Sequence, residues 1–349
     1  MKKIFKSLIL VAAAAMGFTA CQKEIQEEVP VNEGTVQVTF VSGSPETKTT
    51  VDTPDGKPVF AWGENETFAV LEQTDDLAEA TAVTYVKDDE GKANITATFA
   101  ANTDMSEYKY ATIYPASGYV SAESLASATL SLPAVQTMAE GSYDPDADLM
   151  VSEVVTAKVQ PTEAQMVSFT RMAAVVKMTL KNFTLESGDE VEQVIFTAEG
   201  KTLAGTITTD LADPHKFTVA EGVDNVTVNT TSSTDVYFTV LPTTLEEGDA
   251  YTVTILTNKK LYIKQGTIPA KKTLAFEKGM VTLLGVNMEG IAASEKWVLV
   301  RDASTLAEGD IVTIAAVDNN FVLGCNSTNP FPYASYTNPI KAGEYLYHP

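Results

Sequence analysis

Short runs in which hydrophobic and polar residues alternate recur along most of the chain. Alternation with a period of two indicates strands that bury one face and expose the other. Residues 34–41 alternate in this way, and the apolar-rich runs at residues 67–71, 108–114 and 236–241 also indicate strands. Two of these runs stop at Pro115 and Pro242, because proline cannot donate a hydrogen bond to a neighbouring strand. The pattern therefore predicts an all-β fold.

Turn residues refine this fold class. The runs at residues 251–256 and 260–264 flank a short polar segment and predict a β-hairpin. Beyond the first twenty residues, only residues 121–127 suggest a short helix. Threonine and valine dominate the runs, and glycine, aspartate and asparagine separate them at short intervals, which is typical of antiparallel β-sandwiches.

Breaks in the pattern divide the chain into several parts. We expect a first β-sandwich at residues 34–166, a second at residues 167–288 and a linker at residues 289–296. A β module at residues 297–349 follows, with strand-like runs at residues 297–300, 311–315 and 321–324. Three short strands make a poor hydrophobic core. We therefore expect this last module to be incomplete, or to pair with something else.

The N-terminus has the features of a secretory signal of the lipoprotein type. Three lysines precede an apolar run at residues 8–16, and two small residues then precede Cys21. The apolar run is too short to cross a bilayer, which takes about 20 residues. We expect residues 1–20 to be removed and Cys21 to become the lipid-modified first residue, held in a membrane by acyl chains such as palmitate. The alternative is an ordinary cleaved signal with an incidental cysteine.

Residues 21–33 are charged, contain proline and lack aromatic side chains. Such a segment cannot bury enough apolar surface to fold alone, so we expect a disordered acidic tether. The full chain of 349 residues has a formal net charge of −22 and only two arginines, Arg171 and Arg301. A surface of this kind repels nucleic acid, which excludes it as a partner. Cys325 is the only other cysteine, so the mature chain can form no intramolecular disulfide.

Several pieces of the sequence, in their order, resemble the fimbrillin family of Bacteroidetes surface lipoproteins. They are residues 47–49 with 60–70, residues 111–115, residues 132–136 with 141–150, residues 169–175 and residues 237–242. The resemblance covers roughly residues 21–288. It implies tandem transthyretin-like β-sandwiches on a surface-exposed lipoprotein of the cell outer membrane, held there through Cys21. It also implies fimbrial subunits, or host or glycan ligands, as partners, and joining by a strand from a neighbouring subunit.

Two departures from the family pattern favour an anchored accessory or a non-polymerising relative over a shaft subunit. Maturation of the best-known pilins follows an arginine, but no arginine lies between Cys21 and Arg171. In addition, the module at residues 297–349 replaces the C-terminal part in which pilins carry the donated strand.

The carboxylates of Asp144, Asp146 and Asp148 are spaced like the first half of a calcium loop. Such a loop has glycine at its sixth position and a glutamate at its twelfth. Here those positions are Leu149 and Val155, so the three aspartates are weak metal candidates and we expect a structural acidic loop. The resemblance likewise implies an architectural segment.

Other candidate residues have structural explanations that compete with functional ones. Arg171 lies in an apolar stretch, and we expect a carboxylate or backbone carbonyls to hold it near the domain junction; the alternative is a carboxylate clamp. Trp62 and Trp297 are expected in cores rather than as sugar-stacking platforms. His215 and His348 are isolated, which disfavours a zinc site.

No serine-hydrolase elbow, zinc-protease helix or phosphate-binding loop occurs in the sequence, so we expect no catalytic residue and no cofactor. The sequence favours a non-enzymatic, lipid-anchored surface protein of the fimbrillin type, either a structural or adhesive component of fimbriae or an accessory. One alternative is a glycan-binding lipoprotein that uses tail aromatics, the candidates being Tyr333, Tyr336, Tyr345 and Tyr347. Another is the N-terminal part of a secreted enzyme whose catalytic domain lies beyond Pro349.

Overall fold

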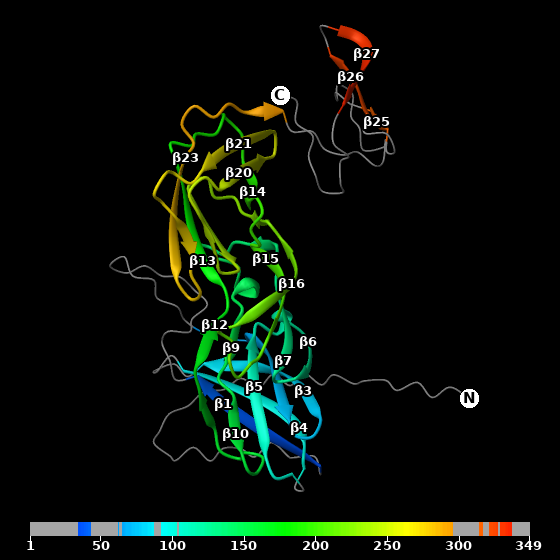
Figure 1. Ribbon diagram of the computed structural model, residues 1–349, viewed down its shortest axis with the longest axis vertical. Helices are drawn as coiled ribbons and strands as arrows, with labels where there is room; N and C mark the ends of the chain where they lie inside the picture. Colours follow the sequence, from blue (N-terminus) through cyan, green and yellow to red (C-terminus); the bar gives the residue numbers. More distant parts are fainter. Residues whose placement is uncertain are drawn as a thin grey trace, which may run out of the picture.

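The computed structural model describes residues 34–42, 62, 65–86, 92–102, 105–295, 314–316, 321–326 and 329–336. Their architecture is all-β, as the alternating pattern predicts, with two short 3-10 turns, η2 (Ala116–Gly118) and η3 (Pro145–Ala147) (Figure 1). Cys21, Trp297 and His348 lie outside the described residues. Within these ranges, we find no helix with the length and apolarity needed to span a membrane.

The first body is a nine-stranded sheet at the lower end of Figure 1. Its order is β11 (Gln165–Val167), β1 (Thr35–Ser42), β4 (Ala93–Ala100), β3 (Leu77–Val86), β2 (Thr67–Gln73), β5 (Tyr108–Tyr114), β9 (Met150–Ser152) and β12 (Phe169–Arg171), with β10 (Val155–Ala157) beside β5. The strands predicted at residues 34–41, 67–71 and 108–114 are confirmed as β1, β2 and β5.

An aromatic cluster fills the core of this body. The indole of Trp62 is 6% exposed and lies 5.3–5.4 Å, between ring centroids, from Phe68, Tyr114 and Phe169. Its Nε1 donates a hydrogen bond of 3.1 Å to Ser42 Oγ. Buried indoles need such a partner for the N–H group. The prediction that Trp62 is a core residue is therefore confirmed.

The second body is a sandwich of two main sheets. One has the order β18 (Asp235–Val240), β13 (Ala174–Lys181) and β23 (Val281–Asn287). The other has the order β24 (Ser294–Glu295), β21 (Lys260–Thr267), β20 (Ala250–Thr257), β14 (Val191–Ala198), β17 (Asn225–Asn229) and β8 (Val135–Thr137). A pair formed by β19 (Thr243–Leu245) and β22 (Leu274–Phe276) completes it. The predicted hairpin is confirmed as β20 and β21.

A four-stranded sheet joins the two bodies. Its order is β16 (Phe217–Val223), β15 (Ala204–Thr209), β7 (Ser127–Leu132) and β6 (Tyr119–Ser124). The short helix expected at residues 121–127 is wrong, because β6 and β7 form a hairpin there. Pairing of β7 with β15 decides the conformation: Leu130 lies opposite Ile207, and both side chains are fully buried. Tertiary packing thus overrides the weak local preference for a helix.

Strand exchange interlocks the bodies. The segment β6–β8 precedes the last strands of the first sheet in sequence, yet β7 pairs with β15, and β8 pairs with β17. A continuous core lies between the bodies, formed on one side by residues such as Leu71 and Ile113 and on the other by Ile207 and Leu241.

The division into domains at residue 166 stays a prediction. The pairing shows that β11 and β12 belong to the first sheet and that β13 opens the second body.

Near the C-terminus, β25 (Ile314–Ala316), β26 (Phe321–Asn326) and β27 (Asn329–Tyr336) form an antiparallel sheet. Two of the strand-like runs expected in the last module correspond to β25 and β26. The third, at residues 297–300, lies outside the described residues.

Candidate functional site

A buried ion pair lies where the first sheet passes into the second body. Arg171 ends β12 and is only 6% exposed, and Asp148 is fully buried. Arg171 Nε and Nη2 donate to the two carboxylate oxygens of Asp148 at 2.5 and 2.9 Å. This two-point geometry gives the strongest kind of arginine–carboxylate contact. The expectation of an arginine held by a carboxylate near the junction is confirmed.

Tyr143 completes this buried group. Its hydroxyl donates to Asp148 Oδ2 at 2.7 Å and accepts a 3.3 Å hydrogen bond from Arg171 Nη2. Burial raises the pKa of the Tyr143 hydroxyl well above its ordinary value, and the charge of Asp148 adds to this effect. Burial disfavours the charge of Arg171, but the charge and hydrogen bonds of Asp148 outweigh it and raise the pKa of the guanidinium. The tyrosine is therefore neutral, and the arginine stays charged.

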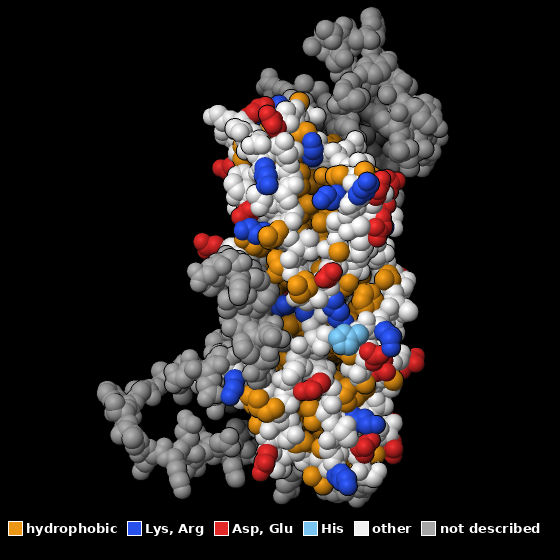
Figure 2. Space-filling view, turned by 60° about the vertical axis from the view of Figure 1, so that its left-hand side comes forward, with side chains coloured by type: hydrophobic (Ala, Val, Ile, Leu, Met, Phe, Trp, Pro, Cys, Tyr) orange, Lys and Arg blue, Asp and Glu red, His pale blue; other side chains and the backbone are white. Residues whose placement is uncertain are grey.

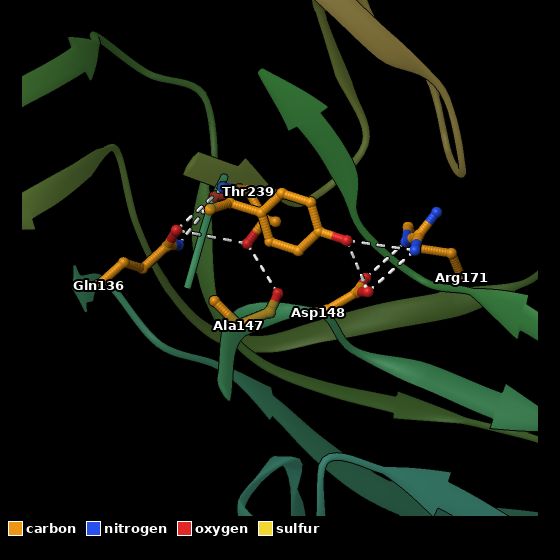
Figure 3. A network of polar contacts seen from close by, with 6 residues as sticks. Gln136, Ala147, Asp148, Arg171 and Thr239 are labelled. Atoms are coloured by element: carbon orange, nitrogen blue, oxygen red, sulfur yellow. Dashed lines mark hydrogen bonds and ion pairs between the residues drawn. The ribbon is translucent and has the colours of Figure 1, made fainter. Parts of the chain in front are cut away.

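Gln136 binds the second body from the other side of the same region (Figure 3). Its Oε1 accepts from the Thr239 backbone N–H at 2.9 Å, and its Nε2 donates to the Thr239 carbonyl at 2.9 Å. The side-chain amide therefore takes the place of a neighbouring strand along β18. Thr239 Oγ1 also donates to the carbonyl of Ala147 at 2.7 Å, which connects β18 to η3.

The structure separates the three aspartates of the acidic loop by role. Asp144 accepts hydrogen bonds from the backbone N–H groups of Thr137 and Asp146, at 2.7 and 3.0 Å, and caps η3. Asp146 is exposed, while Asp148 pairs with Arg171. In the described ranges, no group of three histidine, cysteine or acidic side chains could hold a metal ion. The sequence singled out Asp148 and Arg171 separately, but nothing in their spacing indicates that they meet.

A half-buried lysine makes a second contact between elements. Lys278, in the turn between β22 and β23, donates a hydrogen bond to the carbonyl of Pro214 in the loop between β15 and β16. Burial lowers the pKa of Lys278 to about 8, although the charge of Asp213 acts in the opposite direction. Asp213 forms an exposed ion pair with Lys216 at 2.8 Å, and His215 in the same loop is also exposed.

The edges of the sheets are the remaining surfaces that could act in recognition. An edge strand presents unpaired N–H and C=O groups to other chains, and proteins usually protect such strands. Several described edges are protected. Gln136 covers β18, and β24 pairs with the start of β21. In β16 and β6, shifts of register interrupt the pairing. β11 pairs with only the last three residues of β1, and the rest of β1 carries no exposed large apolar side chain.

Among the described strands, none protects the edge formed by β23. β23 pairs there only with β13, in parallel and in unbroken register from Val281 to Asn287. The Leu283 side chain is 76% exposed, and that of Met280, which precedes the strand, is 57% exposed. We call the side of β23 that faces away from β13 the open edge. On the face brought forward in Figure 2, which includes the side of Figure 1 where β23 lies, basic side chains lie beside hydrophobic ones.

Two hydrogen bonds show which residues serve the open edge. Val175 N donates to Met280 O at 2.9 Å, and Met288 N donates to Lys181 O at 2.8 Å. Backbone groups alternate in direction along a strand, so even-numbered residues of β23 face β13. The odd-numbered residues point their N–H and C=O groups to the open edge; they are Val281, Leu283, Gly285 and Asn287.

The Arg171 side chain is expected to be essential to stability. Arg171→Met should lower the free energy of unfolding by about 3–5 kcal/mol, because the carboxylate of Asp148 stays buried without its charge partner. Urea unfolding followed by circular dichroism measures this. Adding Asp148→Asn should recover part of the loss. Lys216→Met, which removes only the exposed pair with Asp213, serves as the control and should change little; equal losses for the two variants would contradict the prediction.

The lowered pKa of Lys278 predicts a pH dependence. Between about pH 8 and 10.5 the unfolded chain holds the proton that the folded chain has lost, so this group makes stability rise with pH. In Lys278→Met that contribution is absent. The stability difference between wild type and variant should therefore change by about 1 kcal/mol from pH 7.5 to 9.5, after allowance for partial exposure. Urea unfolding at both pH values tests this, and a constant difference would refute it.

No family model and no curated protein matches the chain. Several solved structures do. A candidate cell adhesion protein from Bacteroides uniformis is 16% identical with a TM-score of 0.44, over 76% of this chain and 98% of that one. A candidate cell adhesion protein from Bacteroides ovatus is 12% identical with a TM-score of 0.45, over 77% and 100%. A fimbrial protein from Bacteroides ovatus is 11% identical with a TM-score of 0.32, over 74% and 50%. The chain is thus similar in structure, at low sequence identity, to candidate cell adhesion and fimbrial proteins of Bacteroides.

Proposed function

We propose that this chain is a lipid-anchored protein of the cell surface, that it serves as a structural or adhesive component or accessory of fimbriae, and that β-strand addition joins it to its partners. The observation that carries the proposal is the open edge of β23. A regular, unprotected edge with an exposed Leu283 offers main-chain hydrogen bonds for affinity and side-chain contacts for register. In this proposal the chain is not an enzyme.

The N-terminal sequence supports the location. Acyl chains on Cys21 would hold the protein in the outer membrane, since each buried CH₂ contributes about 0.8 kcal/mol. The acidic tether at residues 21–33 would then give the body reach from the membrane. The ordered fimbrillin-like pieces over residues 21–288 support the same assignment.

The junction supports a mechanical role. A protein that links a membrane to an external partner must pass force from one end to the other without unfolding between them. Here β7 and β8 cross between the bodies, and Arg171, Asp148 and Gln136 hold the crossing in place. Both bodies share a continuous apolar core, so no flexible linker separates them.

The anchor is testable directly. In cells of the native host given radiolabelled palmitate, the wild-type protein should become labelled and remain with the outer membrane. Cys21→Ser should remove the label and leave the protein no longer held in that membrane. A Cys21→Ser protein attached as tightly as wild type would contradict the anchor.

Strand addition is tested at the open edge. Cross-linking on intact cells followed by affinity purification should recover a partner with the wild-type protein, and Leu283→Lys should lose it, because a charge on an edge strand opposes pairing. Val120→Lys is the matched control, since Val120 is 54% exposed on the irregular edge strand β6. If no partner is recovered, or if both variants lose it equally, the proposal is wrong.

A further inference from the structure

The open edge has a specific side-chain pattern on its outer face. Val281 packs against a small cluster that contains Tyr143, Val175 and Tyr237, so this end of the edge is apolar. Leu283 comes next and is largely exposed. Gly285 follows and has no side chain. A strand added to this edge therefore meets two apolar positions and then an empty one.

Lys181 occupies the space over Gly285. A Cβ atom built on Gly285 would lie 2.9 Å from Lys181 Cε and 3.0 Å from its Nζ. The exposed lysine therefore extends from β13 over β23, and its ammonium group lies beside Gly285. Within the described part of the chain, Lys181 has no ion-pair partner. The third position of the edge thus presents an unpaired positive charge.

These positions define the strand that fits. Antiparallel pairing is slightly more stable per residue than parallel pairing. An antiparallel partner places an acidic residue opposite Gly285, an apolar residue opposite Leu283 and another opposite Val281. Read from its N-terminus, this strand has the pattern acidic–x–apolar–x–apolar, in which all three residues lie on the face that carries Lys181.

The tether of this chain contains the pattern as Glu27, Val29 and Val31. Pro30 also fits: backbone direction alternates, so the missing N–H of Pro30 faces away from β23. We propose that the tether of a second copy of this chain docks antiparallel on the open edge, with Glu27 opposite Gly285, Val29 opposite Leu283 and Val31 opposite Val281. This inference rests on the strand-addition part of the proposed function and identifies its donor.

The tether cannot reach the open edge of its own molecule. Only residues 32–34 separate Val31 from β1, and this stretch spans at most about 14 Å. The Ser42 end of β1 pairs with β11, which leads through β12 to the second body. Thr35 lies at the other end of β1, about 25 Å along the strand from Ser42. Figure 1 shows β1 in the lower body and β23 in the upper one. The donor is therefore another molecule, and the contact is of the head-to-tail type.

A proline pair tests the register. The protein is the mature chain with Cys21→Ser, which lacks acyl groups, and sedimentation velocity over a range of concentrations measures self-association. Val29→Pro should weaken association about tenfold or more, because it removes an N–H that faces β23 and places the ring against the edge. Glu28→Pro, one residue away, should change it little, because that N–H faces outward. A synthetic peptide of residues 23–32 should compete with the association.

A charge exchange tests the contact with Lys181. Glu27→Lys should weaken association, and the added Lys181→Glu should restore it; a merely structural role for either residue would give no restoration. Equal effects of the two proline variants, or a failed restoration, overturn the inference. A mature chain that stays monomeric also overturns it, and the proposed function still stands if a Leu283-dependent partner is recovered from cells. If no partner is recovered from cells while the tether contact is intact, the fimbrial role in the proposed function is refuted and this inference stands.

Discussion

The charged contact between Arg171 and Asp148 is the constraint on which the arrangement of the two bodies depends. Both groups are almost completely removed from water, which is unfavourable unless their charges and hydrogen bonds are satisfied. Two short hydrogen bonds and the Tyr143 hydroxyl provide that satisfaction. The loop before β9 and the end of β12 must therefore lie in one place, and β13 leaves the first sheet from there.

Strand exchange builds on this fixed point. The chain leaves the first body after η2, forms β6, β7 and β8 against the second body, and returns to the first as β9. Each body thus contains residues whose neighbours in sequence belong to the other. Because β2 and β5 bury side chains on both faces, the shared core continues through them into the second body. Relative movement of the bodies would require the shared core to separate and the contacts among Arg171, Asp148 and Tyr143 to break.

The sequence predicts strands of two kinds. β1 buries alternate side chains and follows the period of two, while β5 and β18 are buried on both faces, so their apolar runs, which stop at Pro115 and Pro242, indicate them instead. Residues 121–127 mislead because β6 is mostly exposed and its conformation comes from pairing through β7 with β15. Which strands exchange between the bodies depends on contacts between distant residues, and no local pattern contains that information.

The same distinction between local pattern and distant contacts applies to the candidate residues. The sequence predicts that a carboxylate or backbone carbonyls hold Arg171 and that the three aspartates form a structural acidic loop, but neither pattern indicates that Asp148 and Arg171 meet. Gln136 gave no signal, since its role arises only where β8 lies beside β18. The open edge of β23 was equally hidden, because exposure of Leu283 depends on which strand ends the sheet. Cys21 remains a prediction from the sequence.

The amide of Gln136 has a consequence for any assembly built from this molecule. By occupying the main-chain groups of Thr239, and with the Met138 sulfur at the Tyr237 N–H, it covers one margin of the β18–β13–β23 sheet, whereas no described strand covers the opposite margin. A partner strand could then join this sheet at one margin only. A series of molecules connected in this way would have distinct leading and trailing ends.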